Sequence, residues 1–358
     1  MKAVAPVRLV FPVVASFLAL SPATRAWDYE GHRLVNQLAL ASLPKNFPAF
    51  ALTPEARERI AFLAGEADRW RNTPDLTLKH CNGPDHYFDM DDLPVLGLDP
   101  KRLSPFRYVF TAQLASARAA HPQTLSTAEL AKDADQTKAL LGFLPWTITE
   151  YYGKLKSGFS SLREFEQAGT PEEIANAQQN IIYIMGVMGH FVGDASQPLH
   201  TTKHFNGWIG ENPNRYSTNR SFHSWIDGGY FNKVGIEREP LFAKVRPAQL
   251  VALGPGAAAT NLFPVVMNYL SDQFQLVEPL YKLDKEYKLP GKTGVDPKGY
   301  EFMTRQLVVA GQMLGDLWFT AWQQAPPDTF LRGQLARRKL KDGEASPAGS
   351  GTPKPKAP

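Results

Sequence analysis

The stretch that decides the fold covers residues 185–200 and reads MGVMGHFVGDASQPLH. Its front half is apolar at helical spacing, and His190 and Asp194 stand four residues apart within it, on one face of the expected helix. Pro198 ends this helix, and His200 follows on the turn. Imidazole and carboxylate groups placed in this way are donors that suit zinc. The alternative is a buried helix whose polar residues satisfy one another.

The same spacing recurs further along the chain, in the segment SFHSWID of residues 221–227. His223 and Asp227 are again four residues apart and have aromatic neighbours. One such pair is weak evidence for a metal site. Two pairs predict ligands that point into one interior from two helices of an α-bundle.

The first 26 residues have the pattern of a secretory signal peptide. Lys2 and Arg8 accompany an apolar run over Leu9–Leu20, and small residues occupy the −3 and −1 positions of a cut after Ala26. The apolar run is too short to span a membrane. We therefore expect a mature chain that begins at Trp27, with an uncleaved anchor as the alternative.

Composition predicts one globular body with a basic tail. No later segment has eighteen apolar residues in a row, so we expect a secreted or periplasmic monomer without stable membrane insertion. Cys81 is the single cysteine and forms no internal disulfide. Residues 27–331 contain 29 basic and 33 acidic residues and show no basic DNA-binding stripe. Residues 332–358 are rich in Pro, Gly, Ser, Ala and Lys, which predicts a disordered tail.

Between the ends, the pattern predicts an all-α, single-domain fold. No alternating run indicates a strand, and no internal repeat is present. Asp28 is placed to cap a helix that stops at Pro44, and Thr53 opens a second helix that runs to about Trp70. Residues 79–105 are expected to be loop. Further helices are expected near 106–120, 127–156, 171–194, 222–231, 257–281 and 297–323.

Three polar residues of the first hundred join the central ones as candidate ligands. His32 lies on the first expected helix, Asp68 near the end of the second, and His86 in the loop that follows. Taken singly, each has a plain structural alternative, such as a solvated carboxylate or a helix cap.

Taken together, these residues resemble the zinc ligands of the single-strand nuclease and phospholipase C superfamily, and the S-one/P-one nuclease branch is the closer match. The spacing from Trp27 to His32, the H-x3-D-x5-H pattern and the final H-x3-D carry the resemblance, which extends to about residue 227. The phospholipases usually have a longer gap after the terminal Trp and a Glu in the last pair. The nine matching positions are Trp27, His32, Asp68, His86, His190, Asp194, His200, His223 and Asp227.

The resemblance implies a helical bundle with three zinc ions at the base of a cleft. The amino group and carbonyl of Trp27 would belong to the second zinc, which makes cleavage after Ala26 a condition of its binding. Asp194 would bridge the first and second ions. The implied ligand sets are Asp68, His86, His190 and Asp194 for the first zinc, Trp27, His32 and Asp194 for the second, and His200, His223 and Asp227 for the third.

The family also implies roles for residues that hold no metal. Asp89 matches the carboxylate that orients the attacking water, Arg71 a cation at the scissile phosphate, and Tyr87 an aromatic ring that stacks on a base. A loop cap, a surface ion pair and simple packing are the respective alternatives. The Gly-Gly-Asn turn that usually helps to form the base pocket is missing, and Asn206 and Asn212 are its candidate replacements.

The function that this resemblance implies is zinc-dependent hydrolysis of single-stranded DNA and RNA to 5′-phosphorylated products, with 3′-nucleotidase activity. One alternative is a zinc phospholipase C that acts on phosphatidylcholine-like lipids, because one metal cluster can hydrolyse either phosphodiester. Another is an inactive metal-binding structural protein. The remaining histidines, His80, His121 and His204, are expected at the surface, with a place in the cleft lining as the alternative for His204.

Overall fold

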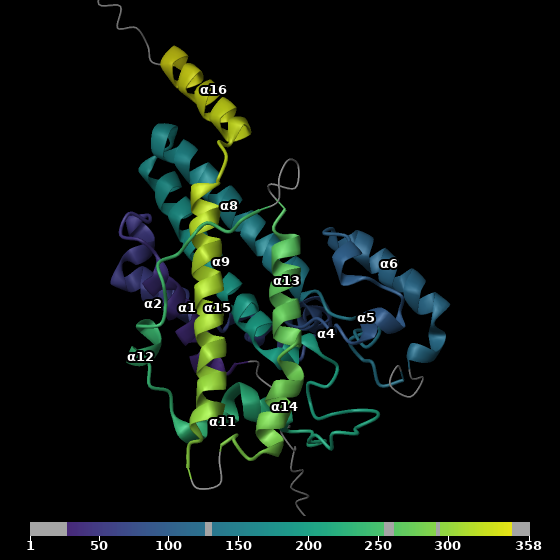
Figure 1. Cartoon of the computed structure of the whole chain (residues 1–358). Coiled ribbons are helices and arrows are strands. Elements are labelled where there is room, and N and C mark those ends of the chain that lie inside the picture. Colours follow the sequence, from purple (N-terminus) through teal and green to yellow (C-terminus); the bar gives the residue numbers. More distant parts are fainter. Residues whose placement is uncertain (1–26, 126–130, 254–260, 291–293, 346–358) are drawn as a thin grey trace, which may run out of the picture.

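A computed structural model describes residues 27–125, 131–253, 261–290 and 294–345, and within these ranges the chain is helical, with no strand (Figure 1). The expected signal peptide lies outside the described residues. The α-helices are α1 (Tyr29–Ser42), α2 (Pro54–Leu63), α3 (Glu66–Arg71), α4 (Leu76–Asn82), α5 (Asp92–Val95), α6 (Arg107–Ala120), α8 (Leu144–Ala168), α9 (Pro171–Ser196), α10 (Phe222–Ser224), α11 (Tyr230–Val234), α12 (Glu239–Phe242), α13 (Phe263–Phe274), α14 (Val277–Lys285), α15 (Pro297–Gln323) and α16 (Thr329–Ala345). Short 3-10 segments are η1 (Ala49–Leu52), η2 (Gly83–His86), η3 (Pro100–Arg102), η4 (Pro122–Thr124) and η5 (Pro198–Thr201), and η6 (Trp225–Gly229) is a π-helical turn.

Helix α9 is the centre of the bundle, and its two ends are set by local sequence. Thr170 and Glu173 form a reciprocal capping box at its start, where Pro171 takes the first helical position. The helix ends just before Pro198, as expected. It packs against α8, α15, α2 and α1, so its second half is buried on every side (Figure 1).

Glycine residues on α15 and α9 let α1 and α2 pack unusually close to these two helices. A Cβ atom added to Gly311 of α15 would lie 2.5 Å from Leu38 Cβ of α1. On α9, a Cβ atom at Gly186 would lie 2.5 Å from Leu63 Cβ, and one at Gly193 would lie 2.8 Å from His32 Nδ1. Because carbon atoms in contact are about 3.5–4.0 Å apart, a larger residue at these positions would push the helices apart.

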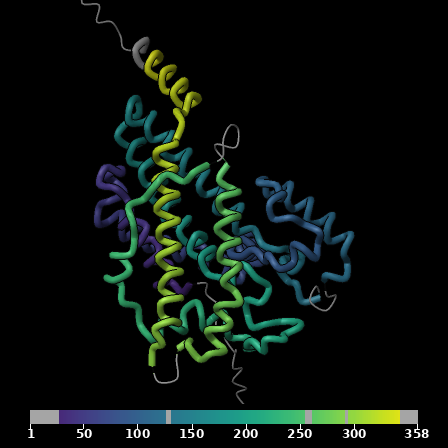
Figure 2. The backbone as a smooth tube through the Cα atoms, viewed as in Figure 1, coloured from purple at the N-terminus to yellow at the C-terminus, as the bar shows by residue number. Residues whose placement is uncertain are grey.

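The segment that follows α12 crosses α15 on its way to α13 (Figure 2). Its backbone is hydrogen-bonded to side chains of α15: Gln249 N donates to Asp316 Oδ1 over 2.7 Å, and Val251 N donates to Thr320 Oγ1 over 2.9 Å. The carboxylate and hydroxyl of α15 thus satisfy backbone groups that have no helical or sheet partner. Residues 254–260 lie outside the described residues.

The described residues share one connected hydrophobic core, which includes the buried indoles of Trp27, Trp146 and Trp318. This confirms the expected all-α, single-domain fold. None of the described helices combines the length and apolar character that a membrane crossing needs.

Several predicted helices are divided where the chain turns tightly. The helix predicted over 53–70 is α2 followed by α3, and the break falls at Gly65, where a Cβ atom would meet the Tyr29 ring at 2.6 Å. The helix predicted over 222–231 contains the π-helical turn η6. The one predicted over 257–281 begins only at Phe263 within the described residues and is divided after Phe274. Residues 79–105, predicted as loop, contain α5 and short 3-10 turns and begin within α4.

The helix predicted over 127–156 is wrong in its position, because α8 covers 144–168. Before it, the buried Asp133 carboxylate accepts hydrogen bonds from the backbone N–H groups of Thr137 (2.8 Å) and Lys138 (3.0 Å) and closes a turn. Gly142 then adopts a φ of +93°, which helical residues do not have. Residues 126–130 lie outside the described residues.

The tail predicted to be disordered over 332–358 is helical as far as Ala345, as part of α16. Arg332 pairs with Glu164 of α8 at 2.7 Å, Arg338 pairs with Glu173 of α9 at 2.7 Å, and Leu335 is buried. These long-range contacts stabilise a helix that the polar composition of the segment does not predict. Residues 346–358 lie outside the described residues.

The close contact of α1 with α15 gives a first prediction. We expect Gly311→Ala to lower the free energy of unfolding by about 1–3 kcal/mol, because its methyl group would overpack against Leu38. Urea unfolding followed by circular dichroism measures the change.

The matched control is Gly153→Ala in α8, an exposed position where the new methyl group meets no atom within 4 Å. This change should raise stability by roughly 0.5–1 kcal/mol, since alanine is the better helix former. Equal effects of the two substitutions would contradict the close-packing argument.

Candidate metal centre

Helix α9 places His190 and Asp194 on one face, and both side chains are fully buried. His190 Nδ1 lies 2.7 Å from the carbonyl oxygen of Ala64. This backbone acceptor holds a proton on Nδ1 and orients the ring, as second partners of metal-binding histidines do. His190 Nε2 then faces Asp194 Oδ2 at 3.3 Å. The helix therefore presents a ring nitrogen and a carboxylate oxygen to one small space.

His86, from η2, completes a first group with these two residues. Its Nδ1 lies 2.9 Å from Asp194 Oδ2 and 3.0 Å from His190 Nε2. The candidate ligand atoms of all three residues lie within 4.8 Å of one another. Zinc ligands sit about 2.0–2.2 Å from the ion, so a single ion between these atoms could reach every one of them.

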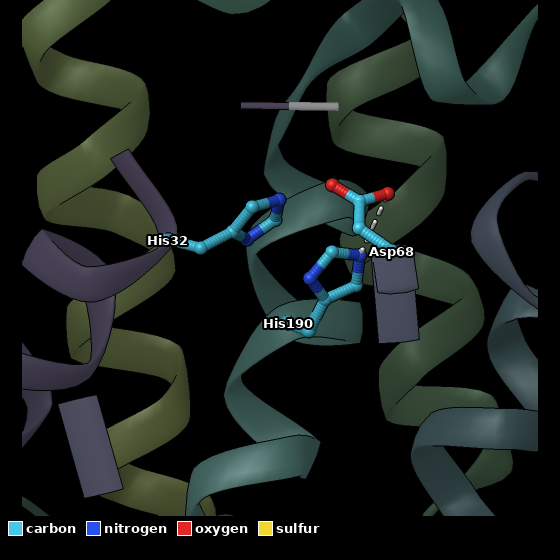
Figure 3. Close-up of side chains that lie close together, drawn as sticks. All are labelled: His32, Asp68 and His190. Carbon is cyan, nitrogen blue, oxygen red and sulfur yellow. Dashed lines mark ion pairs between the residues drawn. The ribbon is translucent and has the colours of Figure 1, made fainter. Parts of the chain in front are cut away.

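A second group consists of His32 from α1, Asp68 from α3 and His190 from α9 (Figure 3). The His32 and His190 rings are stacked with centroids 3.9 Å apart, and Asp68 Oδ1 lies 3.9 Å from His190 Nε2. The resemblance implied that Asp68 and His32 serve different ions. The geometry brings them into one group and makes His190 common to the first and second groups.

Asp194 is the residue that connects these groups. While Oδ2 faces the first group, Oδ1 lies 3.5 Å from His32 Nε2 and 3.9 Å from His200 Nδ1. One carboxylate thus turns its two oxygens towards imidazoles from three other segments of the chain. This is the position that a carboxylate shared between neighbouring ions would require.

The third group, His200, His223 and Asp227, lies beside the first two. His200 Nδ1 bonds to the carbonyl oxygen of His86 at 2.5 Å, and its Nε2 lies 3.0 Å from His223 Nε2. His223 Nε2 is also 2.8 Å from Asp227 Oδ2. Gln197 Nε2 donates to the other oxygen of Asp227 and holds the carboxylate in place.

Trp27 anchors the beginning of the described chain at this centre. Its indole Nε1 donates to the carbonyl oxygen of Gly193 at 3.1 Å, and the next residue, Asp28, donates its backbone N–H to the carbonyl oxygen of Asp227 at 3.0 Å. The backbone of residue 27 is therefore held between α9 and the segment that carries the third group. Its peptide link to residue 26 lies outside the described residues.

Protonation states in the centre favour a bound cation. Burial lowers the pKa of His32 to about 3 and that of His86 to about 4, so both imidazoles are neutral near pH 7. Burial opposes ionisation of Asp194, but His190 and His200 hold its pKa well below the usual value. Burial likewise opposes the charge on His190, yet Asp194 and Asp68 raise its pKa.

One carboxylate oxygen of the centre has no hydrogen-bond donor, which supports the fit of a cation there. Asp194 Oδ1 is buried and accepts no hydrogen bond from the described part of the chain. An ionised oxygen without a partner is costly in the protein interior. A metal ion would satisfy it. The three buried groups could therefore each hold a metal ion.

A cleft of about 410 Å³ opens onto the centre. His200 and His223 line it together with Arg71, Tyr87 and Asp89, so the residues expected to act on substrate do meet there. Its remaining lining residues are Lys79, Gly83, Asp135, Thr137, Lys138, Leu140, Leu199 and Phe205.

Two of the expected substrate-binding residues do not line this cleft. Both ends of the Asn212 amide bond to the backbone of Tyr216, at 2.9 and 2.8 Å, and close a loop. Asn206 lies outside the cleft lining as well, and its neighbour Phe205 takes part instead, with its ring 5.6 Å from that of His223. The sequence signal for this cleft residue was an aromatic side chain, Phe205, five positions after the candidate ligand His200.

His204, expected at the surface, is buried and stacks on Trp208 with ring centroids 4.0 Å apart. The aromatic neighbour covers the imidazole, which a pattern of polar residues alone does not reveal. His80 is exposed and His121 half-buried, and neither belongs to the three groups.

Comparisons with models of protein families, with curated proteins and with solved structures found no match to this chain.

The central position of Asp194 gives a second prediction. We expect Asp194→Asn to lower the metal content per chain by about two ions and His223→Ala by about one, because the first residue faces two groups and the second only one. Mass spectrometry of the dialysed proteins measures the content.

His121→Ala, outside the three groups, is the control and should keep the metal content of the unchanged protein. Circular dichroism must show that all three variants are folded. An Asp194→Asn protein with full metal content would rule out the shared carboxylate.

Proposed function

We propose that the protein is an exported zinc-dependent phosphodiesterase of the S-one/P-one nuclease type. It would hydrolyse single-stranded DNA and RNA to 5′-phosphorylated products and remove 3′-phosphates from nucleotides. One observation carries this proposal: His200 and His223 of the third buried His/Asp group line a cleft that also contains a cationic, an aromatic and an acidic side chain, Arg71, Tyr87 and Asp89.

Zinc is the metal that the donor set favours. The groups offer only imidazole nitrogens and carboxylate oxygens, and three such ligands leave coordination positions for water and substrate. When bound, adjacent zinc ions lower the pKa of water and offset the charge that develops on phosphate and leaving oxygens.

Arg71 is placed to bind the scissile phosphate. Its Nη2 donates to Asp68 Oδ1 at 2.7 Å, so the guanidinium is anchored to the second group while its side chain lines the cleft. A guanidinium has five N–H donors in a planar fork that matches phosphate oxygens. The same contact with Asp68 thus orients a metal ligand and a substrate ligand together.

Asp89 is suited to orient the attacking water and to take its proton. Burial, followed by the nearby charges of Asp91 and Asp92, raises its pKa well above the usual value. In its ionised form, a carboxylate with a raised pKa is a stronger base than an exposed one. Its backbone N–H donates to the carbonyl oxygen of Leu141 at 2.7 Å, which fixes its position at the cleft.

Tyr87 provides a ring on which a nucleic acid base can stack. The segment around Gly142 holds it in place: Leu144 N donates to the Tyr87 carbonyl oxygen at 3.2 Å, and a Cβ atom at Gly142 would lie 2.8 Å from Cδ2 of the ring. Stacking is indifferent to base identity. This accounts for a substrate range that includes DNA and RNA of any sequence.

The free amino group of Trp27 would contribute a ligand to the second group after removal of residues 1–26. The buried indole and the Asp28 contact to Asp227 support this role, because they hold residue 27 at the centre. Amino-terminal sequencing of the exported protein, together with its zinc content, tests it: an exported chain that keeps residue 26 and full zinc would exclude the amine ligand.

The choice of substrate is tested with the mature protein, single-stranded DNA and phosphatidylcholine vesicles. We expect hydrolysis of the DNA, with loss of activity after chelation and recovery on addition of zinc. Turnover of the lipid alone would favour a phospholipase C. Metal binding without hydrolysis of either substrate would favour the third alternative, an inactive metal-binding structural protein.

The stacking role is tested by Tyr87→Ala. We expect KM for single-stranded DNA to rise about tenfold, since a base–aromatic contact is worth about 1–3 kcal/mol, with a smaller change in kcat. Tyr87→Phe, which keeps the ring, is the matched control and should retain KM. A Tyr87→Ala protein with the original KM would exclude stacking.

A further inference from the structure

The cleft extends beyond the metal groups to a wall that the proposed chemistry does not use. This wall is formed by α4 and by the turn at residues 133–138, and it contributes Lys79 and Lys138 to the cleft lining. Lys79 is half-buried and Lys138 is exposed. Two cations from separate segments thus border the same cavity as His200 and His223.

The two segments of the wall are fixed to each other. Next to Lys79, His80 places its Nδ1 2.8 Å from the carbonyl oxygen of Asp135. The buried Asp133 carboxylate accepts the backbone N–H of Lys138 at 3.0 Å. The backbones that carry the two lysines are therefore held in place before any ligand binds, which lowers the entropic cost of binding.

The wall carries two acidic residues beside the two lysines, but the carboxylates of Asp133 and Asp135 accept hydrogen bonds within the turn. Neither Lys79 nor Lys138 forms an ion pair with any described residue, whereas the Arg71 cation is paired with Asp68. Asp135 Oδ1, on the same wall, accepts a hydrogen bond from Thr137 Oγ1 at 3.0 Å. Lysine side chains that line a cleft and have no ion-pair partner are available to bind anionic groups of a ligand.

We propose that Lys79 and Lys138 bind a second phosphate of the substrate, one position away from the scissile phosphate. This inference rests on the proposed function and narrows it: the substrate is a phosphodiester chain rather than a molecule with a single phosphate. A phosphatidylcholine headgroup carries a quaternary ammonium, which the two lysines would repel. A nucleic acid strand offers each of them an anion.

The test compares two substrates of the zinc-loaded mature protein, a single-stranded DNA oligonucleotide and bis(p-nitrophenyl) phosphate, which has one phosphate. For the double variant Lys79→Ala/Lys138→Ala, we expect the ratio of kcat/KM for the oligonucleotide to kcat/KM for the small ester to fall at least tenfold. The slope of log kcat/KM for the oligonucleotide against log salt concentration should also flatten by about 0.7 for each phosphate that the variant no longer neutralises.

The matched control is Lys45→Ala/Lys244→Ala, which removes the same charge from exposed positions outside the cleft lining. Lys79→Arg/Lys138→Arg should restore the substrate ratio, because it keeps both charges. An unchanged ratio and salt slope in Lys79→Ala/Lys138→Ala, or an equal loss in the control, would overturn the second phosphate site. Absence of hydrolysis by the unchanged protein would instead overturn the proposed function, so the two failures are distinguishable.

Discussion

The structure depends on one buried negative charge, the carboxylate of Asp194. It lies near the end of α9, in the buried half of that helix, and is surrounded by four imidazoles, from His32, His86, His190 and His200. A carboxylate removed from water must be compensated by positive charge or by hydrogen bonds. Here Oδ2 lies within hydrogen-bond distance of His86 Nδ1, at 2.9 Å, whereas Oδ1 accepts no hydrogen bond from the described residues. A bound cation would supply the missing compensation for Oδ1, and this requirement links the fold of the bundle to its candidate metal centre.

The helical scaffold surrounds Asp194 with imidazoles by packing segments that are distant in sequence close together, with little room for movement. Gly186 and Gly193 bring α2 and α1 against α9, and the second of them stands directly beside the His32 ring. Backbone carbonyls then orient the rings, as Ala64 does for His190 and His86 does for His200. The rings of His190 and His200 are thus each supported by the main chain of another segment. Such support preserves ligand geometry to within the small tolerance that metal sites demand.

Sequence alone predicted the parts of the site that follow from local periodicity. A spacing of four residues places His190 with Asp194, and His223 with Asp227, on one helical face whatever the remaining fold. The cleft wall could not be predicted in this way. Asp133 closes its turn through side-chain to backbone bonds, and His80 joins it to α4, 55 residues away along the chain. Helix α16 was missed for the same reason, since its ion pairs reach residues more than 160 positions earlier.

Metal groups of this type do not by themselves choose a substrate, because the same ligands would polarise any phosphodiester. Selectivity must come from residues whose mutual positions depend on tertiary structure. In this cleft the candidates that we propose for this role are the rings of Tyr87 and Phe205 and the cations Lys79 and Lys138. Rings accept a base or a lipid chain equally well, whereas lysines that have no ion-pair partner distinguish a polyanion from a zwitterion. The two lysines of the cleft wall are therefore the feature that most clearly separates the proposed nuclease from a phospholipase with the same candidate metal ligands.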